Sequence, residues 1–327
     1  MKPALTFIGV GSVLFSATFG SLMRPNADAA SPEGAALTPE MVGEGTISTP
    51  QDEFGGSFSP DGNTVYFDRS LPPHYLYTMW ESHKINGKWS KPELLPFTGE
   101  YRDSDPVLSP DGRTLLFVSD RPAPGVDQHH FDIWISNWDG KKWSAPIDPG
   151  PPLNGPHSEY FASMAANGNI YFTMAPDDND PEIDILVSRL INGKYAVPEN
   201  LGPKLNGKGI TNVEAFVSPD EKFLLIGAFG RPDSLGSSDI YVSYKEESGW
   251  STPVNLGPIV NTPAREYSPR LTPDGKRLIF TSERGMGTEK RDKPWTIPEF
   301  EMKSCSVLNG YGNIYSVPIN VLPKAAP

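Results

Sequence analysis

Acidic residues recur at one position of a repeated pattern in this sequence, where they could act as acid and base or hold a cation. Each stands six residues before a turn motif, and one further glutamate follows the fourth such position by two residues. If the repeats converge on one axis, two carboxylates about 8 Å apart repel by roughly 2 kcal/mol at an effective dielectric constant of about 20. Such groups must meet a cation, pair with a base, bind water or hold a proton. The candidate catalytic residues are Glu53, Asp103, Glu159, Glu214, which follows Asn212, and Glu266.

Basic and aromatic residues stand next to these acidic positions. Rings can stack on a sugar or a peptide while the carboxylates transfer protons, which would make the ring of positions a binding or catalytic site. The alternative is that the carboxylates bond the backbone of neighbouring repeats and serve the fold. Residues that break the repeat, such as Asn212, favour a function. The predicted ligand-binding residues are Arg102, Arg265, His157, Tyr101, Tyr160 and Tyr267.

Other kinds of site find less support. His129 and His130, with Asp127 and Asp132, could ligate a metal, as could His157, but no H-x-x-x-H or C-x-x-C spacing accompanies them. No metal site is therefore assigned, although a divalent cation among the ring carboxylates stays open. The G-x-S-x-G motif of serine hydrolases and the glycine motifs of nucleotide-binding proteins are absent from the sequence.

The elements that must position these residues follow from the turn motif. Ser-Pro-Asp-Gly at residues 59–62 precedes a strand-like run, and it returns at 109–112, as Thr-Pro-Asp-Gly at 272–275, and in altered form at 165–168 and 218–221. Proline fixes the first turn position, Asp bonds its own backbone and Gly accepts a positive φ, so each motif predicts a hairpin. The runs end at Phe67, Phe117, Phe172, Ile226 and Phe280, which lie 50, 55, 54 and 54 residues apart. Five hairpins at a nearly fixed period indicate a repeat architecture.

Two more strands complete each unit. One begins Asp-Ile or Asn-Ile, at residues 132, 184, 239 and 313, and the other carries an aromatic residue and a proline in the pattern Trp-Ser-x-Pro. Four strands in about fifty residues are typical of a propeller blade. The aromatic residues of the fourth strands are expected to be structural, packed between blades. They are Trp89, Trp143, Tyr195 and Trp250.

These motifs resemble the WD40-like PD40 repeat of TolB-type β-propellers. The resemblance rests on the turn motif, on Ser119-Asp120-Arg121 and Ser282-Glu283-Arg284 after it, and on the Asp-Ile strand, and it covers residues 38–322. It implies an all-β fold, a five-bladed β-propeller of four-stranded blades. It leaves the activity open, because propellers host unrelated functions.

The blades are predicted near residues 52–95, 102–148, 158–202, 211–257 and 265–322, within a propeller that spans 37–323. The last blade lacks a fourth strand, whereas residues 37–43 carry the signature of one without a blade of their own. We therefore predict that this N-terminal strand completes the last blade, since an open ring would expose two strand edges. Residues 285–309 interrupt the fifth blade and are expected to form a long loop.

The first residues predict export. Lys2, an apolar run over residues 4–23 and an A-x-A site at 27–29 describe a signal peptide over residues 1–29, followed by a flexible leader over 30–36. We expect a periplasmic or secreted protein, with no membrane contact after cleavage. The net charge of −12 disfavours nucleic acid. The single cysteine, Cys305, excludes an internal disulfide, so packing must stabilise the fold.

Two classes of function remain. The first is an exported TolB-like propeller that acts as a binding scaffold through its central funnel, with a glycan, a peptide or an envelope protein as partner, and as a monomer. The second is a carbohydrate-active enzyme, a glycoside hydrolase or lyase that uses the funnel carboxylates. The shared acidic position favours binding over catalysis, and no cofactor is required.

Overall fold

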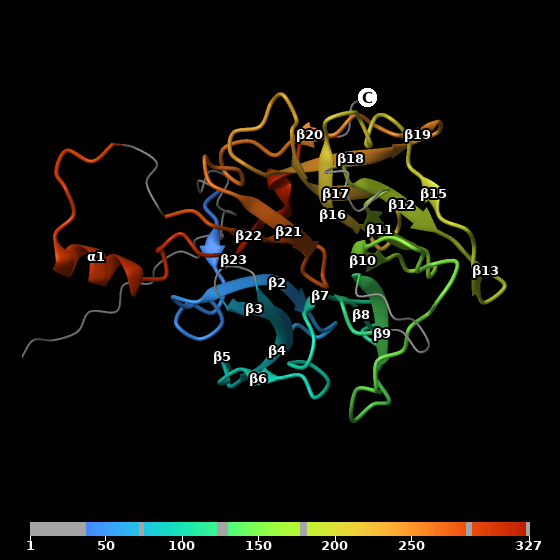
Figure 1. Cartoon of the computed structure of the whole chain (residues 1–327), viewed down its shortest axis with the longest axis horizontal. Helices are drawn as coiled ribbons and strands as arrows, with labels where there is room; N and C mark the ends of the chain where they lie inside the picture. Colours follow the sequence, from blue (N-terminus) through green and yellow to red (C-terminus); the bar gives the residue numbers. More distant parts are fainter. Residues whose placement is uncertain (1–36, 72–74, 123–129, 177–181, 286–289, 325–327) are drawn as a thin grey trace, which may run out of the picture. The chain divides into compact units, whose positions relative to one another are not determined.

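Five small antiparallel sheets surround a common centre (Figure 1), so the chain is a five-bladed β-propeller, as the sequence predicts. The computed structural model describes residues 37–71, 75–122, 130–176, 182–285 and 290–324. The predicted signal peptide and leader lie outside these residues, as do Asp127 and His129.

The strands run from the centre of the ring outwards in each blade. The first blade holds β2 (Asp52–Phe58), β3 (Thr64–Leu71), β4 (Leu76–Ile85), β5 (Lys88–Trp89) and β6 (Glu93–Leu94), and the second holds β7 (Asp103–Leu108), β8 (Thr114–Ser119) and β9 (Asp132–Asn137). The third holds β10 (Glu159–Met164), β11 (Ile170–Met174), β12 (Asp184–Ser188), β13 (Leu190–Ile191), β14 (Lys194–Tyr195) and β15 (Glu199–Asn200). The fourth holds β16 (Thr211–Val217), β17 (Phe223–Phe229), β18 (Asp239–Glu246), β19 (Gly249–Trp250) and β20 (Val254–Asn255). The fifth holds β21 (Glu266–Leu271), β22 (Arg277–Ser282), β23 (Asn313–Pro318) and β1 (Glu40–Met41).

Each turn between the first and second strands is fixed by its own side chains. In the first blade, Ser59 Oγ donates to Asp61 over 2.6 Å, and Asp61 accepts the Asn63 N–H over 3.0 Å. Gly62 closes this turn at φ +69°, a conformation that side chains disfavour. The turn motif therefore sets the register of the hairpin by local bonding alone.

The fourth strand differs from the sequence prediction. The aromatic residue of the Trp-Ser-x-Pro pattern extends the third strand in a short hairpin, in which β5 pairs with the end of β4. Ser90 closes this hairpin by donating its N–H to the His83 carbonyl over 2.8 Å. The outermost strand follows a few residues later, as β6, β15 and β20, and Ile147 makes only an isolated bridge to Ile135 in the second blade.

The ring closes through the N-terminal strand, as predicted. β1 pairs antiparallel with β23, Glu40 opposite Ser316 and Met41 opposite Tyr315. Glu40 also meets Arg277 of β22 at 2.8 Å. Ile47, a few residues later, is fully buried between the fifth and first blades. The two ends of the propeller are thereby held in one sheet.

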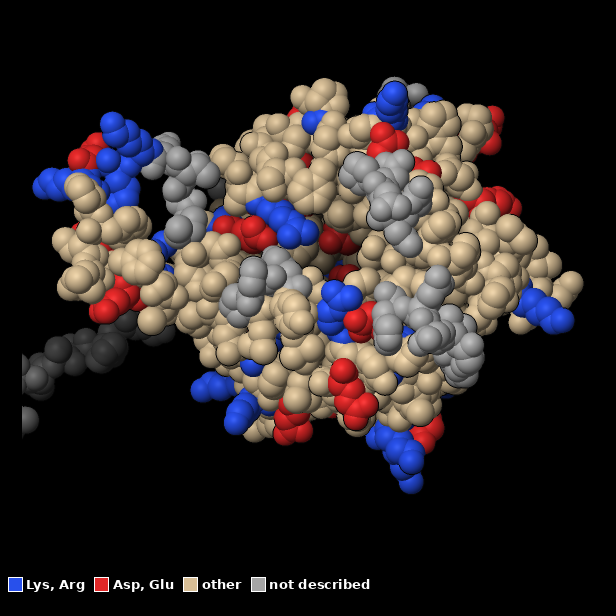
Figure 2. Space-filling model, in the orientation of Figure 1, with Lys and Arg blue, Asp and Glu red and all other residues tan. Residues whose placement is uncertain are grey.

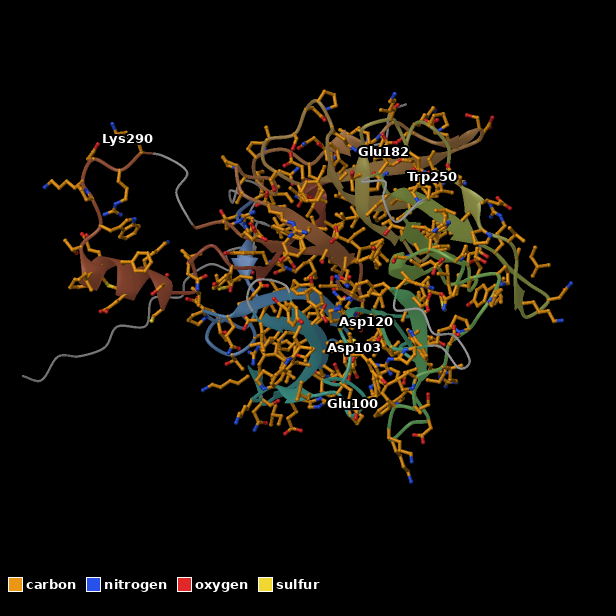
Figure 3. The ribbon with its side chains drawn as sticks, viewed as in Figure 1. Glu100, Asp103, Asp120, Glu182, Trp250 and Lys290 are labelled. Atoms are coloured by element: carbon orange, nitrogen blue, oxygen red, sulfur yellow. The ribbon has the colours of Figure 1, made fainter. Side chains whose placement is uncertain are left out.

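The core lies between the blades. The described buried apolar residues form five clusters, each shared by two neighbouring blades. Trp143 meets Tyr66 of the first blade edge to face at 5.8 Å, and Trp250 (labelled in Figure 3) meets Tyr171 of the third blade in the same way at 6.0 Å. Both indole rings are buried, which confirms their structural role. Trp89 and Tyr195 are only half-buried.

The insertion in the fifth blade contains a helix where the sequence predicted a loop. α1 (Ile297–Ser304) is capped by Thr296, which forms a reciprocal capping box with Glu299. Eight residues are too few to show a clean helical period, so the capping box and Pro298 in the first turn were its main sequence signals. A 3₁₀ turn, η1 (Ile319–Val321), follows β23. Among the described helices, none has the length and apolar character needed to cross a membrane.

Candidate functional site

A bulge in every innermost strand shapes the centre of the propeller. The pairing with the second strand shifts near the start of the innermost strand in all five blades, between Phe54 and Ser57 in the first and between Asn212 and Glu214 in the fourth. A bulge re-aims the side chains around it. Positive φ angles mark it at Gly55, Asp105, Phe161 and Ser268, each two residues after a predicted acidic position or its equivalent.

A pocket of about 330 Å³ opens at the end of the channel where the innermost strands begin. Basic and acidic side chains gather around the hollow in the middle of this face (Figure 2). Five aromatic side chains contribute to the wall, together with two arginines and two carboxyl groups. The residues that line the pocket are Phe54, Tyr77, Arg102, Ser104, Asp105, Val118, Phe131, Tyr160, Glu214, Arg265, Tyr267 and Ser268.

The two arginines are held in place on aromatic rings. Arg102 lies 4.7 Å from the centre of the Phe131 ring and pairs with Asp120 over 2.7 Å. Arg265 lies 4.4 Å from the centre of the Tyr267 ring, and its guanidinium is 3.7 Å from Glu283. A stacked and paired guanidinium loses little freedom when it binds a ligand. Both groups are therefore preorganised hydrogen-bond donors at the rim.

Glu214 is the predicted carboxyl group that reaches the pocket. Its side chain is 6% exposed, and Oε2 has no hydrogen-bond partner among the described residues. Burial is the main cause that raises its pKa to about 8, with a further increase from Asp105 and opposing effects of Arg265 and Arg270. Gly227 lies opposite, and a Cβ there would come within 2.1 Å of Oε2. The missing side chain at this glycine makes room for the carboxyl group, which is neutral at pH 7.

Arg270 lies below the pocket as the centre of a buried charged cluster. It is 1% exposed, approaches Asp105 at 3.9 Å and lies 4.9 Å from the centre of the Phe161 ring. Asp68, fully buried, completes the cluster, and burial raises the pKa of Asp68 and of Asp105. Asp68, Asp105 and Glu214 all act on the Arg270 guanidinium. These three carboxyl groups cannot all be ionised without leaving the cluster with a net negative charge. Arg270 also lines a second, smaller cavity of about 110 Å³ at the turn end of the channel.

Three of the predicted ring residues lie elsewhere. Glu53 accepts hydrogen bonds from Thr49 and pairs with Arg69 over 3.1 Å. Asp103, labelled with Asp120 in Figure 3, pairs with Arg121. Glu266 accepts bonds from Thr262 and Ser282 and faces Arg284 at 3.8 Å. These groups tie each innermost strand to the loop before it and to the end of the second strand, which corrects the expectation that all five carboxylates share the mouth.

Glu159 follows a different pattern from these three. Its Oε1 accepts the Gly155 N–H over 2.8 Å, while burial and the neighbouring Asp132 raise its pKa to about 9. Of the predicted ligand-binding residues, Arg102, Arg265, Tyr160 and Tyr267 line the pocket. Tyr101 lies under Arg121, and neither it nor the half-buried His157 lines the pocket.

Three charged residues at or below the pocket were missed in the sequence, as were the rings of Phe54, Tyr77 and Phe131 in its wall. Asp105 stands two residues after Asp103, as Glu214 stands two after Asn212, so the same offset would have found it. Asp68 follows the strand-ending Phe67, at a position where the other blades have Val118, Thr173, Gly227 and Thr281. Arg270 stands two residues before a turn motif, where the other blades have serine, valine or phenylalanine.

The fold and this pocket define the class of protein as a five-bladed β-propeller with a ligand-sized cavity at one end of its channel. No protein-family model and no curated protein matches the chain. Solved structures similar to it include TolB and other propeller proteins.

TolB from Acinetobacter baumannii is 14% identical, over 82% of this chain and 54% of the TolB chain, with a TM-score of 0.46. This chain thus spans about half the length of that structure. A thermostable family-43 glycoside hydrolase is 13% identical over 71% of this chain and 83% of its own, with a TM-score of 0.49. An oligogalacturonate lyase in complex with manganese is 13% identical over 82% and 65%, with a TM-score of 0.41. Likeness at this level extends to the fold at most.

Proposed function

We propose that this protein is an exported binding propeller that holds the end of a glycan in the pocket of its channel. The observation that carries the proposal is the composition of the pocket wall, in which five aromatic rings stand beside two guanidinium groups already stacked on two of them. Sugar rings offer apolar C–H faces to aromatic side chains and hydroxyl groups to fixed donors, so this wall suits them. The volume, about 330 Å³, lies at the small end of ligand pockets, which span about 300–1,000 Å³.

The charge of the pocket favours an uncharged sugar. Arg102 and Arg265 already have acidic partners, and Glu214 is neutral near pH 7 because burial raises its pKa to about 8. A neutral carboxyl group can both donate and accept a hydrogen bond, as a sugar hydroxyl requires. A peptide or an envelope protein is the alternative partner for the same binding role.

Export is part of the proposal and rests on the N-terminal pattern over residues 1–29. Expression of the full chain in a bacterial host, followed by fractionation and mass measurement of the mature N-terminus, tests it. We expect a periplasmic or secreted product that begins near residue 30. A product that keeps Met1 and stays in the cytoplasm would remove export from the proposal.

A glycan array followed by calorimetric titration of the best hit tests the binding role. We expect Tyr160→Ala and Arg102→Ala to weaken binding by about tenfold or more, which corresponds to about 1.4 kcal/mol. Arg189→Ala is the matched control, since Arg189 pairs with Glu199 on the outer part of the third blade. Binding of peptides but of no glycan would redirect the proposal to a peptide partner, and equal binding by all variants would place the site elsewhere.

One observation favours the second candidate function, a glycan-cleaving enzyme. Glu214 holds a proton near pH 7, and Asp105 lies in the same pocket, so a proton donor and a second carboxyl group face one cavity. Prolonged incubation with the bound glycan separates the two functions. A scaffold returns the glycan unchanged, whereas an enzyme gives shorter products whose formation Glu214→Gln abolishes while binding remains.

A further inference from the structure

The third blade departs from the others at its ring residue. In the other four blades an arginine near the end of the second strand contacts that residue, as Arg121 contacts Asp103 and Arg231 contacts Asn212. The third blade has Pro176 four residues after Phe172, where the second blade has Arg121 four residues after Phe117. Among the described residues, no lysine or arginine pairs with Glu159.

Glu159 is left with an unsatisfied carboxyl oxygen inside the protein. The residue is 1% exposed, and Oε2 has no hydrogen-bond partner among the residues that the structure describes. An unpaired buried carboxyl oxygen is costly and calls for a counterpart. Something other than an arginine must supply it in this blade.

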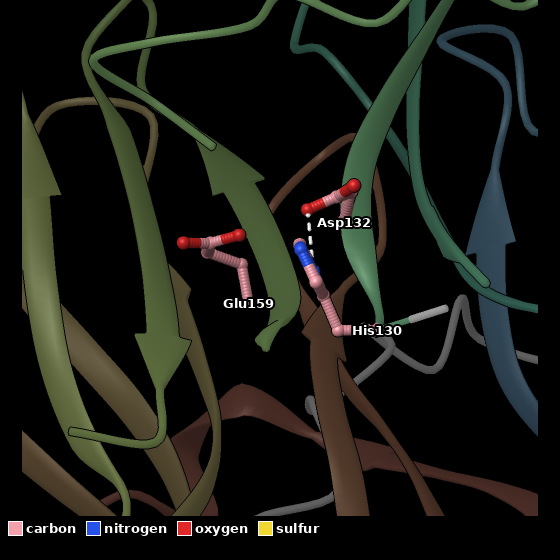
Figure 4. A group of neighbouring side chains, drawn as sticks. All are labelled: His130, Asp132 and Glu159. Carbon is pink, nitrogen blue, oxygen red and sulfur yellow. Dashed lines mark ion pairs between the residues drawn. The ribbon is translucent and has the colours of Figure 1, made fainter. Parts of the chain in front are cut away.

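Two side chains of the second blade lie close to the Glu159 carboxyl group. His130 Nδ1 forms an ion pair with Asp132 Oδ1 over 3.0 Å (Figure 4), and neither atom has a hydrogen-bond partner among the residues that the structure describes. Asp132 is 6% exposed. One ligand atom from each of His130, Asp132 and Glu159 lies within 4.8 Å of the other two. Two carboxyl groups and one imidazole thus converge, and in the described part of the chain no lysine or arginine pairs with either carboxyl group.

The backbone fixes this convergence. Asp132 is the first residue of β9 and Glu159 the first residue of β10, and the Glu159 N–H donates to the Phe131 carbonyl over 2.8 Å. The two blades are therefore joined at the point where the three side chains meet. Asp132 and Glu159 therefore belong to the strands of the framework, and His130 precedes β9 by two residues.

We propose that His130, Asp132 and Glu159 bind a divalent transition-metal ion such as Zn²⁺ or Mn²⁺ between the second and third blades. Ligand atoms about 2.0–2.2 Å from one ion lie about 2.8–3.6 Å apart in tetrahedral or octahedral coordination. The His130–Asp132 separation of 3.0 Å meets this requirement, whereas the Glu159 oxygen, within 4.8 Å of both atoms, would move closer when the ion binds. An imidazole beside two carboxylates suits these ions better than Ca²⁺ or Mg²⁺, which prefer oxygen ligands.

The ion would stand behind the wall of the channel pocket. Phe131 lies between the two ligands of the second blade in sequence, and Tyr160 follows Glu159. Both rings line the pocket, with their centres 5.8 Å apart. None of the three ligands lines it, so the metal site is distinct from the proposed glycan site. Its role is to fix the two blades that carry this part of the wall.

Calorimetric titration of the chelator-treated full chain with ZnCl₂ and with MnCl₂ at pH 7 tests the proposal, with the melting temperature measured in parallel. We expect one equivalent to bind and to raise the melting temperature. Glu159→Gln keeps the shape of the side chain and its bond to Gly155 but should weaken binding by about tenfold or more, as should His130→Ala. His83→Ala is the control, because His83 also faces a carboxylate, Glu81 at 3.8 Å, but is exposed.

Absence of binding by the unmodified protein would overturn the proposal. Equal binding by the unmodified protein and by Glu159→Gln would do the same, because it would place the ion elsewhere. Should His130→Ala fail to fold, Glu159→Gln alone decides. Titration with Co²⁺ gives an independent readout, since its visible spectrum is expected to change on coordination in the unmodified protein and not in Glu159→Gln.

Discussion

Replacing Glu214 by Gln tests the charge state of the carboxyl group in the pocket. In the folded protein its pKa is raised from 4.5 to about 8, mainly by burial and further by Asp105. In the unfolded chain the group titrates near its ordinary value. Below about pH 4.5 both states hold the proton, and the contribution of Glu214 to stability is fully present. As the pH rises towards 8, only the folded state retains the proton, so stability is lost.

The magnitude follows from the shift. Each pH unit between the two pKa values costs about 1.4 kcal/mol of unfolding free energy, so Glu214 should cost the protein about 3–4 kcal/mol between pH 5 and pH 8. Gln cannot ionise, so the Glu214→Gln protein does not lose this unfolding free energy as the pH rises. The unfolding free energy of Glu214→Gln, relative to that of the unmodified protein, should therefore increase by the same amount over this range. Any difference between a carboxylic acid and an amide in hydrogen bonding adds a constant offset.

Urea unfolding followed by tryptophan fluorescence at pH 5.0, 6.5 and 8.0 measures this difference. Other buried carboxyl groups, such as Asp68, titrate in both proteins and cancel to first order. Glu100→Gln, at an exposed position, is the control and should show no trend with pH. A constant difference between Glu214→Gln and the unmodified protein from pH 5 to pH 8 would refute the reasoning, because it would mean that Glu214 ionises in the folded protein as it does in water.

Three more predictions concern the fold. Deletion of residues 37–48 should lower the melting temperature sharply, since it removes β1 and the buried Ile47. An unchanged melting curve would contradict the role of β1 in closing the ring. Trp143→Ala should cost about 3–5 kcal/mol in urea unfolding, and the half-buried Trp89→Ala clearly less; equal losses would contradict the inter-blade packing. Arg270→Met should destabilise the protein by about 3–5 kcal/mol at pH 8 and by less at pH 5, where protonation of the surrounding carboxyl groups relieves their repulsion. An equal loss of stability at pH 5 and at pH 8 would show that those carboxyl groups do not interact with Arg270.

The fold could be predicted because its signals are local and repeated. The turn at residues 59–62 bonds to itself through Ser59 and Asp61, so its geometry depends on four adjacent residues and recurs wherever they do. The closing strand was found because residues 37–43 carry the signature of a fourth strand. The placement of the fourth strand was wrong by a few residues, because Trp89 and Ser90 mark the hairpin before that strand and not the strand itself.

The candidate site could be predicted only in part, because it depends on contacts between blades. The spacing put an acidic group at the start of four innermost strands, but it did not reveal that Arg69 and Arg284 would pair with two of them. The bulges decide which side chains turn into the channel, and no residue type marks a bulge reliably. Asp105 and Arg270 were missed for this reason, although each departs from its counterparts in the other blades.

The most direct test of the proposed glycan site is a crystal structure of the protein with the tightest-binding glycan from the array. We expect electron density for a sugar in the channel pocket, stacked on Tyr160 or Tyr267 and hydrogen-bonded to Arg102, Arg265 or Glu214. Density for the sugar on the outer edges of the blades, with the pocket filled only by water, would contradict the proposal.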